Sequence, residues 1–254
     1  MLANDPTSLF ISNRYAVRLA KTEEDIRKAQ ALRYSIFNIE LGEGLESSHS
    51  NRLDVDRYDA QCDHLLVVDR KTEQIIGTYR MQDYQKARQQ HGFYTAEEFT
   101  LSELPEEMLS ESVEVGRACI HKDHRNGRVL YLLWRGIAEY IKMKSARYLI
   151  GCCSINSTDP GEGWAVMDYL VHNNHVHETY TLVPTPVFDC PKRNYDTGET
   201  QHEVELPQLF RLYLSLGAKV LSNPALDSSF KTIDYLIIVD ITKLDEQTRT
   251  LFFK

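Results

Sequence analysis

The stretch that decides the expected fold is residues 112–121, Ser-Val-Glu-Val-Gly-Arg-Ala-Cys-Ile-His. Its β-branched and small residues predict a strand that carries a glutamate and an arginine three positions apart. Simple alternation would place Glu114 and Arg117 on opposite faces of a sheet, whereas a β-bulge at Gly116 would turn both side chains toward one cleft. An acid and a base within one strand mark this stretch as a candidate site.

The residues that follow predict a turn and a helix. Residues 122–128 are polar and basic and contain a glycine, and residues 129–144 repeat apolar side chains at helical spacing. The apolar positions are Leu130, Leu133, Trp134, Ile137, Tyr140 and Ile141. The sequence thus predicts a strand, a basic turn and an amphipathic helix in direct succession.

Composition argues against several classes of protein. The 254 residues are 42% hydrophobic, enough for a core, and their net charge of −8 argues against a general nucleic-acid binder. No run of about 18 apolar residues predicts a membrane span. The first ten residues lack the pattern of a signal peptide and the five cysteines include no Cys-x-x-Cys pair, so we expect a cytoplasmic protein with reduced thiols.

The chain is expected to form a single domain over residues 14–254, preceded by a flexible lead-in at 1–13. Hydrophobic patterning and capping residues predict further elements around the central strand. Strands are predicted at 15–19, 64–69, 74–81, 148–155, 218–222 and 233–241, and helices at 22–37, 207–216 and 245–253. A polar, acidic loop at 42–58 and an irregular segment at 157–206 interrupt this pattern.

Polar residues outside the central strand have alternative interpretations. Asp56 lies in the acidic loop and Asp59 directly follows it. The two aspartates are either part of a functional site or part of a solvated turn. Simple burial is favoured over redox chemistry for Cys152 and Cys153, because no neighbour explains a lowered thiol pKa. The histidines within 172–177 match zinc ligands in type, but their polar surroundings favour a solvated loop, so no metal is expected.

The order of these elements resembles the GNAT superfamily of N-acetyltransferases. The resemblance implies an α+β, three-layer architecture with a mixed sheet and helices on both of its faces. In this superfamily two central strands splay apart and an acyl thioester lies in the gap between them. Here the splayed pair would be 113–121 and 148–155, with 157–206 as an insertion before the next helix. The fold alone does not determine the acyl donor.

Shorter motifs narrow the resemblance. The sequence resembles two enzyme families, the acyl-homoserine-lactone synthases and the carrier-protein-dependent N-acyl amino acid synthases. The residues that carry this resemblance are Arg33, Phe37, Asp56, Asp59, Arg80 and the Glu114-x-x-Arg117 pair. Further motifs resemble the ornithine N-acyltransferase branch of this group, and they lie at 62–67, 77–80, 93–99, 133–137, 213–218 and 234–235. The resemblance spans about residues 14–250, and its specificity comes from the order and number of these motifs together.

This resemblance implies a reaction and its substrates. The protein would transfer a long-chain fatty acyl group, plain or 3-hydroxylated, from acyl carrier protein to the α-amine of an amino acid. Ornithine is the expected acceptor, in the first step of ornithine-lipid synthesis. The donor would be the acyl-phosphopantetheine group of the carrier, and no bound cofactor is expected. Peripheral contact with a membrane is expected through the lipid product.

The resemblance also implies roles for individual residues. Glu114 would be the general base that deprotonates the amine, with Arg117 as its catalytic neighbour. The substrate-binding residues would be Arg33, Phe37, Asp56, Asp59, Arg80, Cys152 and Ser154. The alternative is that these arginines and carboxylates form an ion-pair network that pins the acidic loop.

One departure from the superfamily pattern concerns the acyl donor. Acetyltransferases of this fold bind the coenzyme A pyrophosphate with a Gln/Arg-x-x-Gly-x-Gly/Ala turn at a helix N-terminus. Residues 125–129 do not fit that spacing, so acyl carrier protein is favoured over coenzyme A. Lys122, Arg125 and Arg128 would dock the acidic carrier by charge complementarity. The alternative is that they belong to a solvated basic helix face.

Three other functions compete with the leading one. The protein could acylate another amino acid, or it could be an acyl-homoserine-lactone synthase with S-adenosylmethionine as acceptor; the long C-terminal half weighs against the latter. From a different class, it could be a non-catalytic, lipid-associated binding protein of the kind labelled haemolysin. No strongly amphipathic basic helix supports that alternative.

Overall fold

The computed structural model describes residues 8–192 and 204–253. Its strands are β1 (Ser8–Ile11), β2 (Tyr15–Leu19), β3 (Asp63–Asp69), β4 (Ile75–Asp83), β5 (Ser112–Ile120), β6 (Tyr148–Ile155), β7 (Lys219–Val220), β8 (Ala225–Asp227) and β9 (Thr232–Asp240). Its α-helices are α1 (Glu23–Tyr34), α2 (Tyr84–Gln89), α3 (Thr95–Glu98), α4 (Glu106–Ser110), α5 (Arg128–Lys144), α6 (Pro160–His172), α7 (Gln208–Ser215) and α8 (Glu246–Phe253). A π-helical segment, η2 (Ser35–Glu40), extends α1, and short 3-10 turns occur elsewhere.

The strands form one mixed sheet. Their order is β1-β2-β3-β4-β5-β6-β9-β7, with β8 paired to β9. All neighbours run antiparallel except β5 and β6, which are parallel. The predicted strands from 15 to 241 are therefore present, and the expected α+β fold with a mixed sheet is confirmed.

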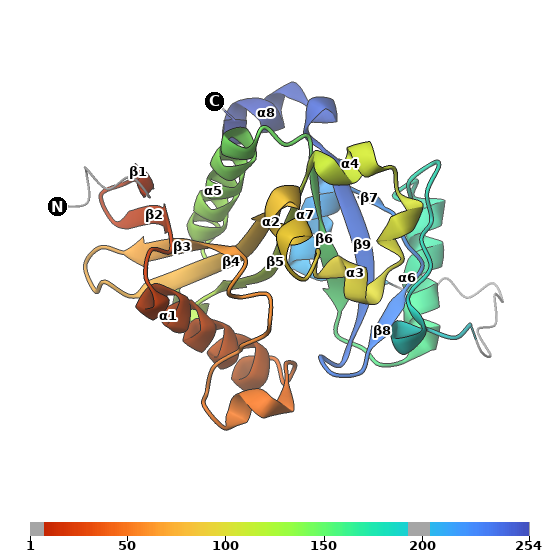
Figure 1. Cartoon of the computed structure of the whole chain (residues 1–254), viewed down its shortest axis with the longest axis horizontal. Helices are drawn as coiled ribbons and strands as arrows, with labels where there is room; N and C mark the ends of the chain where they lie inside the picture. The colour runs from red at the N-terminus through yellow and green to blue at the C-terminus, as the bar shows by residue number, and fades with distance from the viewer. Residues whose placement is uncertain (1–7, 193–203, 254) are drawn as a thin grey trace.

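The sheet forks between its two parallel strands. Only three residues of each strand are paired, Ser112–Glu114 with Tyr148–Ile150, after which β5 and β6 diverge (Figure 1). Gly151 lies at the fork, where a Cβ atom would overlap the carbonyl oxygen of Val115, so only glycine allows this close approach. The expected splay between the two strands is confirmed.

A β-bulge follows the fork in β5. The pairing of β5 with β4 shifts between Cys119 opposite Thr78 and Gly116 opposite Arg80, which leaves one extra residue in β5. Arg117 has a φ of 52°, a left-handed conformation that is uncommon for a residue other than glycine. The bulge anticipated at Gly116 is therefore centred on the following residue.

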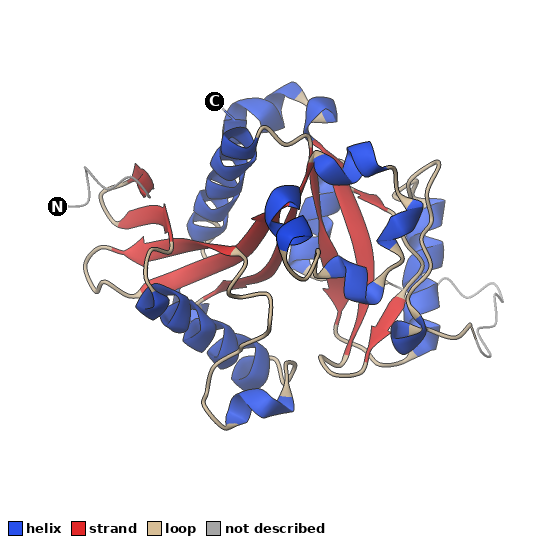
Figure 2. Cartoon of the chain, viewed as in Figure 1, coloured by secondary structure: helices blue, strands red, loops and turns tan. Residues whose placement is uncertain are grey.

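Helices cover both faces of the sheet (Figure 2). Helix α5 packs on β2 to β5, and its buried stripe of Val129, Leu133 and Ile137 joins the main hydrophobic core. Helices α1 and α2 contact β4 and β5, and their core clusters are separate from that of α5. The three-layer arrangement expected from the resemblance is thus present.

Two further segments, residues 8–11 and 157–206, are compared with their predictions. Residues 8–11, part of the expected flexible lead-in, instead form β1 on β2, because Leu9 and Phe10 pack against the main core. The predicted insertion at 157–206 contains α6 and an extended stretch, while its residues 193–203 lie outside the described part. Within the described residues, no helix has both the length and the apolarity needed to cross a membrane.

Candidate active site

A cavity of about 390 Å³ lies at the fork of the sheet. Its lining includes Val115, Gly116 and Arg117 of β5 and Cys152 and Ser154 of β6, the two strands that diverge there. The splay therefore creates a cavity where a sheet would otherwise be continuous.

The cavity reaches both faces of the sheet. Successive side chains of a strand point to opposite faces, and the lining includes Tyr79 and Met81 of β4 together with Arg80 and Gln82 of the same strand. The face that carries α5 and α7 contributes Tyr79, Met81, Val115, Cys153, Phe210 and Tyr213. The opposite face contributes Arg80, Gln82, Thr95, Glu98, Glu114 and Asp234. One end of the cavity is apolar and the other is polar and charged.

Glu114 is fixed at the polar end by four hydrogen bonds. Its Oε1 accepts from the Thr95 amide at 2.8 Å and the Thr95 hydroxyl at 2.7 Å. Its Oε2 accepts from Gln82 Nε2 at 2.6 Å and the Tyr94 amide at 2.9 Å. These two amides begin α3, so the carboxylate caps that short helix. Glu114 thereby fixes the cavity wall formed by α3.

A buried ion-pair network lies beside the polar end. Arg33 of α1 is fully buried and donates to both Asp54 and Asp59, with Nε 2.7 Å from Asp54 Oδ2 and Nη2 2.9 Å from Asp59 Oδ2. Its Nη2 also donates to the Asp54 carbonyl oxygen at 2.5 Å. A planar guanidinium with five donors suits this arrangement. Arg33 therefore ties the acidic loop to α1.

Two further arginines connect this network to the cavity. Arg80 Nη1 donates to Asp56 Oδ1 at 2.5 Å and to Asp59 Oδ1 at 3.0 Å. Arg117 Nη2 donates to Asp56 Oδ2 at 3.2 Å, and its Nε lies 3.5 Å from Asp54 Oδ2. Three arginines are thus matched by three aspartates, and their charges balance.

The network shifts the pKa values of its carboxyl groups. Burial would raise the pKa of Asp56, but the charges of Arg80 and Arg117 outweigh burial and lower it. Burial likewise opposes the lowering at Asp59, where Arg33 and Arg80 bring the pKa well below its usual value. These carboxylates therefore stabilise the fold above the unfolded pKa of about 4, and this contribution is lost as the pH falls through the lowered pKa values.

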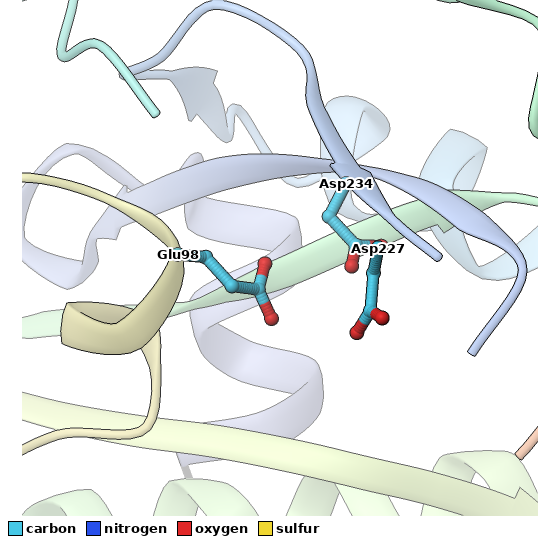
Figure 3. A group of neighbouring side chains, drawn as sticks. All are labelled: Glu98, Asp227 and Asp234. Atoms are coloured by element: carbon cyan, nitrogen blue, oxygen red, sulfur yellow. The ribbon is translucent and has the colours of Figure 1, made fainter. Parts of the chain in front are cut away.

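A second group of acids occupies the same end of the cavity, and none of them forms an ion pair with a Lys or Arg of the described residues. Glu98 from α3, Asp227 from β8 and Asp234 from β9 are buried, and one oxygen of each lies within 4.8 Å of the others. Figure 3 shows the three carboxyl groups converging from their separate elements. We call these residues the acidic cluster. Burial and the neighbouring Asp234 raise the pKa of Glu98 well above its usual value.

The acidic cluster also influences the cysteine beside it. The Cys152 thiol donates to Glu98 Oε2 at 3.3 Å. Burial, and then the nearby Glu98, raise the pKa of Cys152 well above that of a free thiol. Cys152 is therefore a neutral hydrogen-bond donor in the cavity wall and not an activated nucleophile.

Comparison with known proteins identifies relatives over most of the chain. L-ornithine N(alpha)-acyltransferase of Rhizobium meliloti is 32% identical over 240 residues, which span 89% of this chain and 80% of the relative. The chain belongs to the L-ornithine N(alpha)-acyltransferase family. A second relative with that name, from Rhodobacter capsulatus, is 29% identical over 252 residues, which span 94% of each chain. The protein is therefore an acyltransferase, and the alternative of a non-catalytic lipid-binding protein is wrong.

Two further matches concern the fold of this L-ornithine N(alpha)-acyltransferase family member. The family model for an acetyltransferase (GNAT) domain matches residues 32–135, which include β3, β4, β5 and the start of α5. The solved structure of TofI, in a ternary complex with an inhibitor and MTA, superposes with a TM-score of 0.50 at 16% identity, covering 93% of this chain and 96% of TofI. The GNAT fold inferred from element order is confirmed.

The predicted site residues of this acyltransferase fall into two groups. The cavity lining includes Phe37, Arg80, Glu114, Arg117, Cys152 and Ser154. Arg33, Asp56 and Asp59 belong instead to the adjoining ion-pair network, in which the donors of Arg33 are engaged by aspartates. The network proposed as the alternative interpretation is therefore present, and it lies next to a cavity that the remaining residues line.

The three predicted docking residues lie together on the surface. Lys122, Arg125 and Arg128 are exposed in the turn between β5 and α5. Arg125 pairs with Glu40 of η2, and Arg128 lies over the Tyr15 ring with its guanidinium carbon 5.8 Å from the centroid. We call this turn the basic turn.

The acidic cluster is the part of the site that sequence reasoning missed. The motif residues 93–99 and 234–235 were noted in the resemblance, but no role was assigned to Glu98 or Asp234. Asp227 ends the short strand β8, in a segment where no motif was noted. A charged residue inside an otherwise apolar strand is the sequence signal that indicates such a buried site. Asp234 shows this signal within the run Ile233–Val239.

Proposed function

We propose that this protein transfers a long-chain fatty acyl group, plain or 3-hydroxylated, from acyl carrier protein to the α-amine of L-ornithine. The product would be an N-acyl-ornithine, the first intermediate in ornithine-lipid synthesis. The acceptor follows from the names of the relatives that match most of the chain. Acyl carrier protein is proposed as the donor because residues 125–129, in the basic turn, do not fit the spacing of a turn that binds coenzyme A.

The observation that carries this proposal is the cavity that crosses the sheet. Its apolar end, between β4, α7 and the fork, suits a fatty chain. Its polar end, with Arg117, Glu114 and the acidic cluster, suits an amino acid that bears both charges. The thioester carbonyl would lie between the two ends, where β5 and β6 separate.

The reaction exchanges a C–S bond for a C–N bond. The neutral α-amine attacks the thioester carbonyl, the tetrahedral intermediate collapses, and the carrier thiolate leaves. The proton removed from nitrogen passes through a base to that thiolate, so the products are an amide and a free thiol. Amino-acid amines are mostly protonated near neutral pH, so a base contributes roughly two to four powers of ten in rate.

Protein groups at the fork would act as the base and stabilise the oxyanion in this reaction. Glu114 remains the proposed general base, acting on the amine through a bridging water. Four donors already occupy its oxygens, so this water would take the place of one of them, and the Thr95 hydroxyl, which can rotate, is the donor that would yield. Beyond Glu114, the edge of β5 that faces β6 is no longer paired with it. Backbone N–H groups on that edge would stabilise the oxyanion of the intermediate.

The basic turn would dock the carrier protein. Lys122 and Arg128 are exposed cations at the end of β5, the strand that leads to the cavity. Complementary charge speeds association and orients the partner, which would bring the phosphopantetheine arm to the fork.

Acyl carrier protein charged with a long acyl chain provides the direct test. Incubation with the enzyme should release free carrier thiol only when L-ornithine is added, and mass spectrometry should show fatty acid joined to ornithine by an amide. Acyl-coenzyme A, other amino acids and S-adenosylmethionine serve as comparisons. A homoserine lactone product, or no thiol release with any acceptor, would refute the proposal.

A further inference from the structure

The acidic cluster contains unsatisfied hydrogen-bond acceptors. Glu98 Oε1 and Asp234 Oδ1 are buried without a hydrogen-bond partner among the described residues. Glu98 is 0% exposed and Asp234 is 4% exposed, and both line the cavity. A buried acceptor without a donor costs free energy, and native proteins leave few of them. The two orphan oxygens therefore indicate a donor that binds in this part of the cavity.

The charges around the cluster do not neutralise it. Across residues 8–192 and 204–253, no Lys or Arg forms an ion pair with its three carboxylates. Arg117 attracts Asp234, but it is paired with Asp54 and Asp56. Burial raises the pKa of Asp234 to about 7, with Asp227 adding to this and Ser154 opposing it. A cation bound among the three carboxyl groups would supply the positive charge that no described Lys or Arg brings to them in an ion pair.

The spacing of the cluster fits an ammonium group. An alkylammonium has three N–H donors in tetrahedral directions. Acceptors about 2.8 Å from its nitrogen would stand about 4.6 Å from one another. The three cluster oxygens lie within 4.8 Å of one another, and Figure 3 shows Glu98 facing the two aspartates of the neighbouring strands β8 and β9.

We propose that Glu98, Asp227 and Asp234 bind the distal ammonium of a diamino acid acceptor. This inference deepens the proposed function and rests on it. Holding the distal ammonium in the acidic cluster leaves the α-amine as the nucleophile nearer the fork. The cluster would thereby select a diamino acid over a neutral one, and the α-nitrogen over the distal nitrogen.

The test compares L-ornithine with L-norleucine, which has a methyl group where ornithine has its ammonium. With acyl carrier protein as donor, wild-type enzyme should favour ornithine in kcat/KM by about 100-fold or more. Asp234→Asn and Glu98→Gln should raise the KM for ornithine by about 30-fold or more and lower the ornithine-to-norleucine ratio of kcat/KM toward 1. Glu103→Gln, which removes an exposed acid after α3, is the matched control and should change neither.

The outcomes separate this inference from the acyl transfer itself. Equal use of ornithine and norleucine by wild-type enzyme, or a wild-type KM in both variants, would overturn the inference while acyl transfer stood. Activity that EDTA abolishes and Ca²⁺ or Mg²⁺ restores would assign the cluster to a metal and also overturn it. If no acceptor is turned over, the melting temperature decides: ornithine should raise it and norleucine should not, and an equal response to both would refute ammonium binding.

Discussion

At the scale of single residues, Glu114 organises the polar end of the cavity. Its four accepted hydrogen bonds include the two amides at the start of α3, the helix that carries Glu98. Glu114→Gln would place an amide N–H₂ against donors. We expect a loss of turnover of roughly 10²- to 10⁴-fold with carrier binding retained, and a loss of about 1–3 kcal/mol in stability. Steady-state kinetics and thermal unfolding measure the two effects.

The Glu103→Gln variant provides the control for this prediction, because it removes a carboxylate from an exposed position outside the cavity. Wild-type turnover in Glu114→Gln would remove Glu114 from the mechanism. A loss of carrier binding without loss of turnover would contradict the account equally.

Asp234 makes a separate prediction about pH. Burial, with Asp227 adding to its effect, raises its pKa to about 7 from a usual value of 3.8. Because the folded pKa exceeds the unfolded one, the contribution of Asp234 to stability is fully present below about pH 4 and is lost as the pH rises to about 7. Between pH 5 and pH 8 the melting temperature of unliganded wild type should fall relative to Asp234→Asn. Parallel curves would show that Asp234 ionises as an ordinary surface carboxylate.

At the scale of elements, the ion-pair network joins α1 to the acidic loop. Arg33 holds Asp54 and Asp59 in a fully buried setting. Arg33→Met would leave both carboxylates without their main partner, so we expect a loss of about 3–5 kcal/mol. Lys28→Met breaks an exposed pair with Glu24 on the same helix and should cost at most about 0.5 kcal/mol. Urea unfolding measures both, and equal small losses would mean that the loop is held by other contacts.

The basic turn is the second element with a testable role. Lys122→Glu combined with Arg128→Glu should raise the KM for acyl carrier protein by about 10-fold or more at low salt, because it reverses two charges at the docking surface. Turnover of a small acyl-pantetheine donor should be unchanged. Lys243→Glu, an exposed substitution in the turn before α8, is the control. A uniform loss with both donors would argue against docking at this turn.

At the scale of the whole molecule, local patterns predicted most elements and few of their contacts. The apolar spacing of α5 and the strand-like runs of β3 and β4 are properties of continuous segments, so they were visible in the sequence. The fork came from the resemblance in element order. Strand β1 was missed because a four-residue edge strand carries too little pattern to distinguish it from a loop.

The site was predictable where its residues share a strand. Glu114 and Arg117 were found through their spacing, and the bulge brought both to the cavity. The acidic cluster joins residues 98, 227 and 234, which only the pairing of β8 with β9 and the docking of α3 bring together. No pattern within one segment predicts that these three residues lie together.

The central claim is that the forked sheet presents the α-amine of ornithine to a carrier-bound acyl group. The most direct measurement uses L-ornithine labelled with ¹⁵N at the α position, acyl carrier protein as donor, and tandem mass spectrometry of the product. The account predicts that the amide nitrogen carries the label. An unlabelled amide nitrogen, with the acyl group on the distal amine, or release of free fatty acid alone, would contradict it.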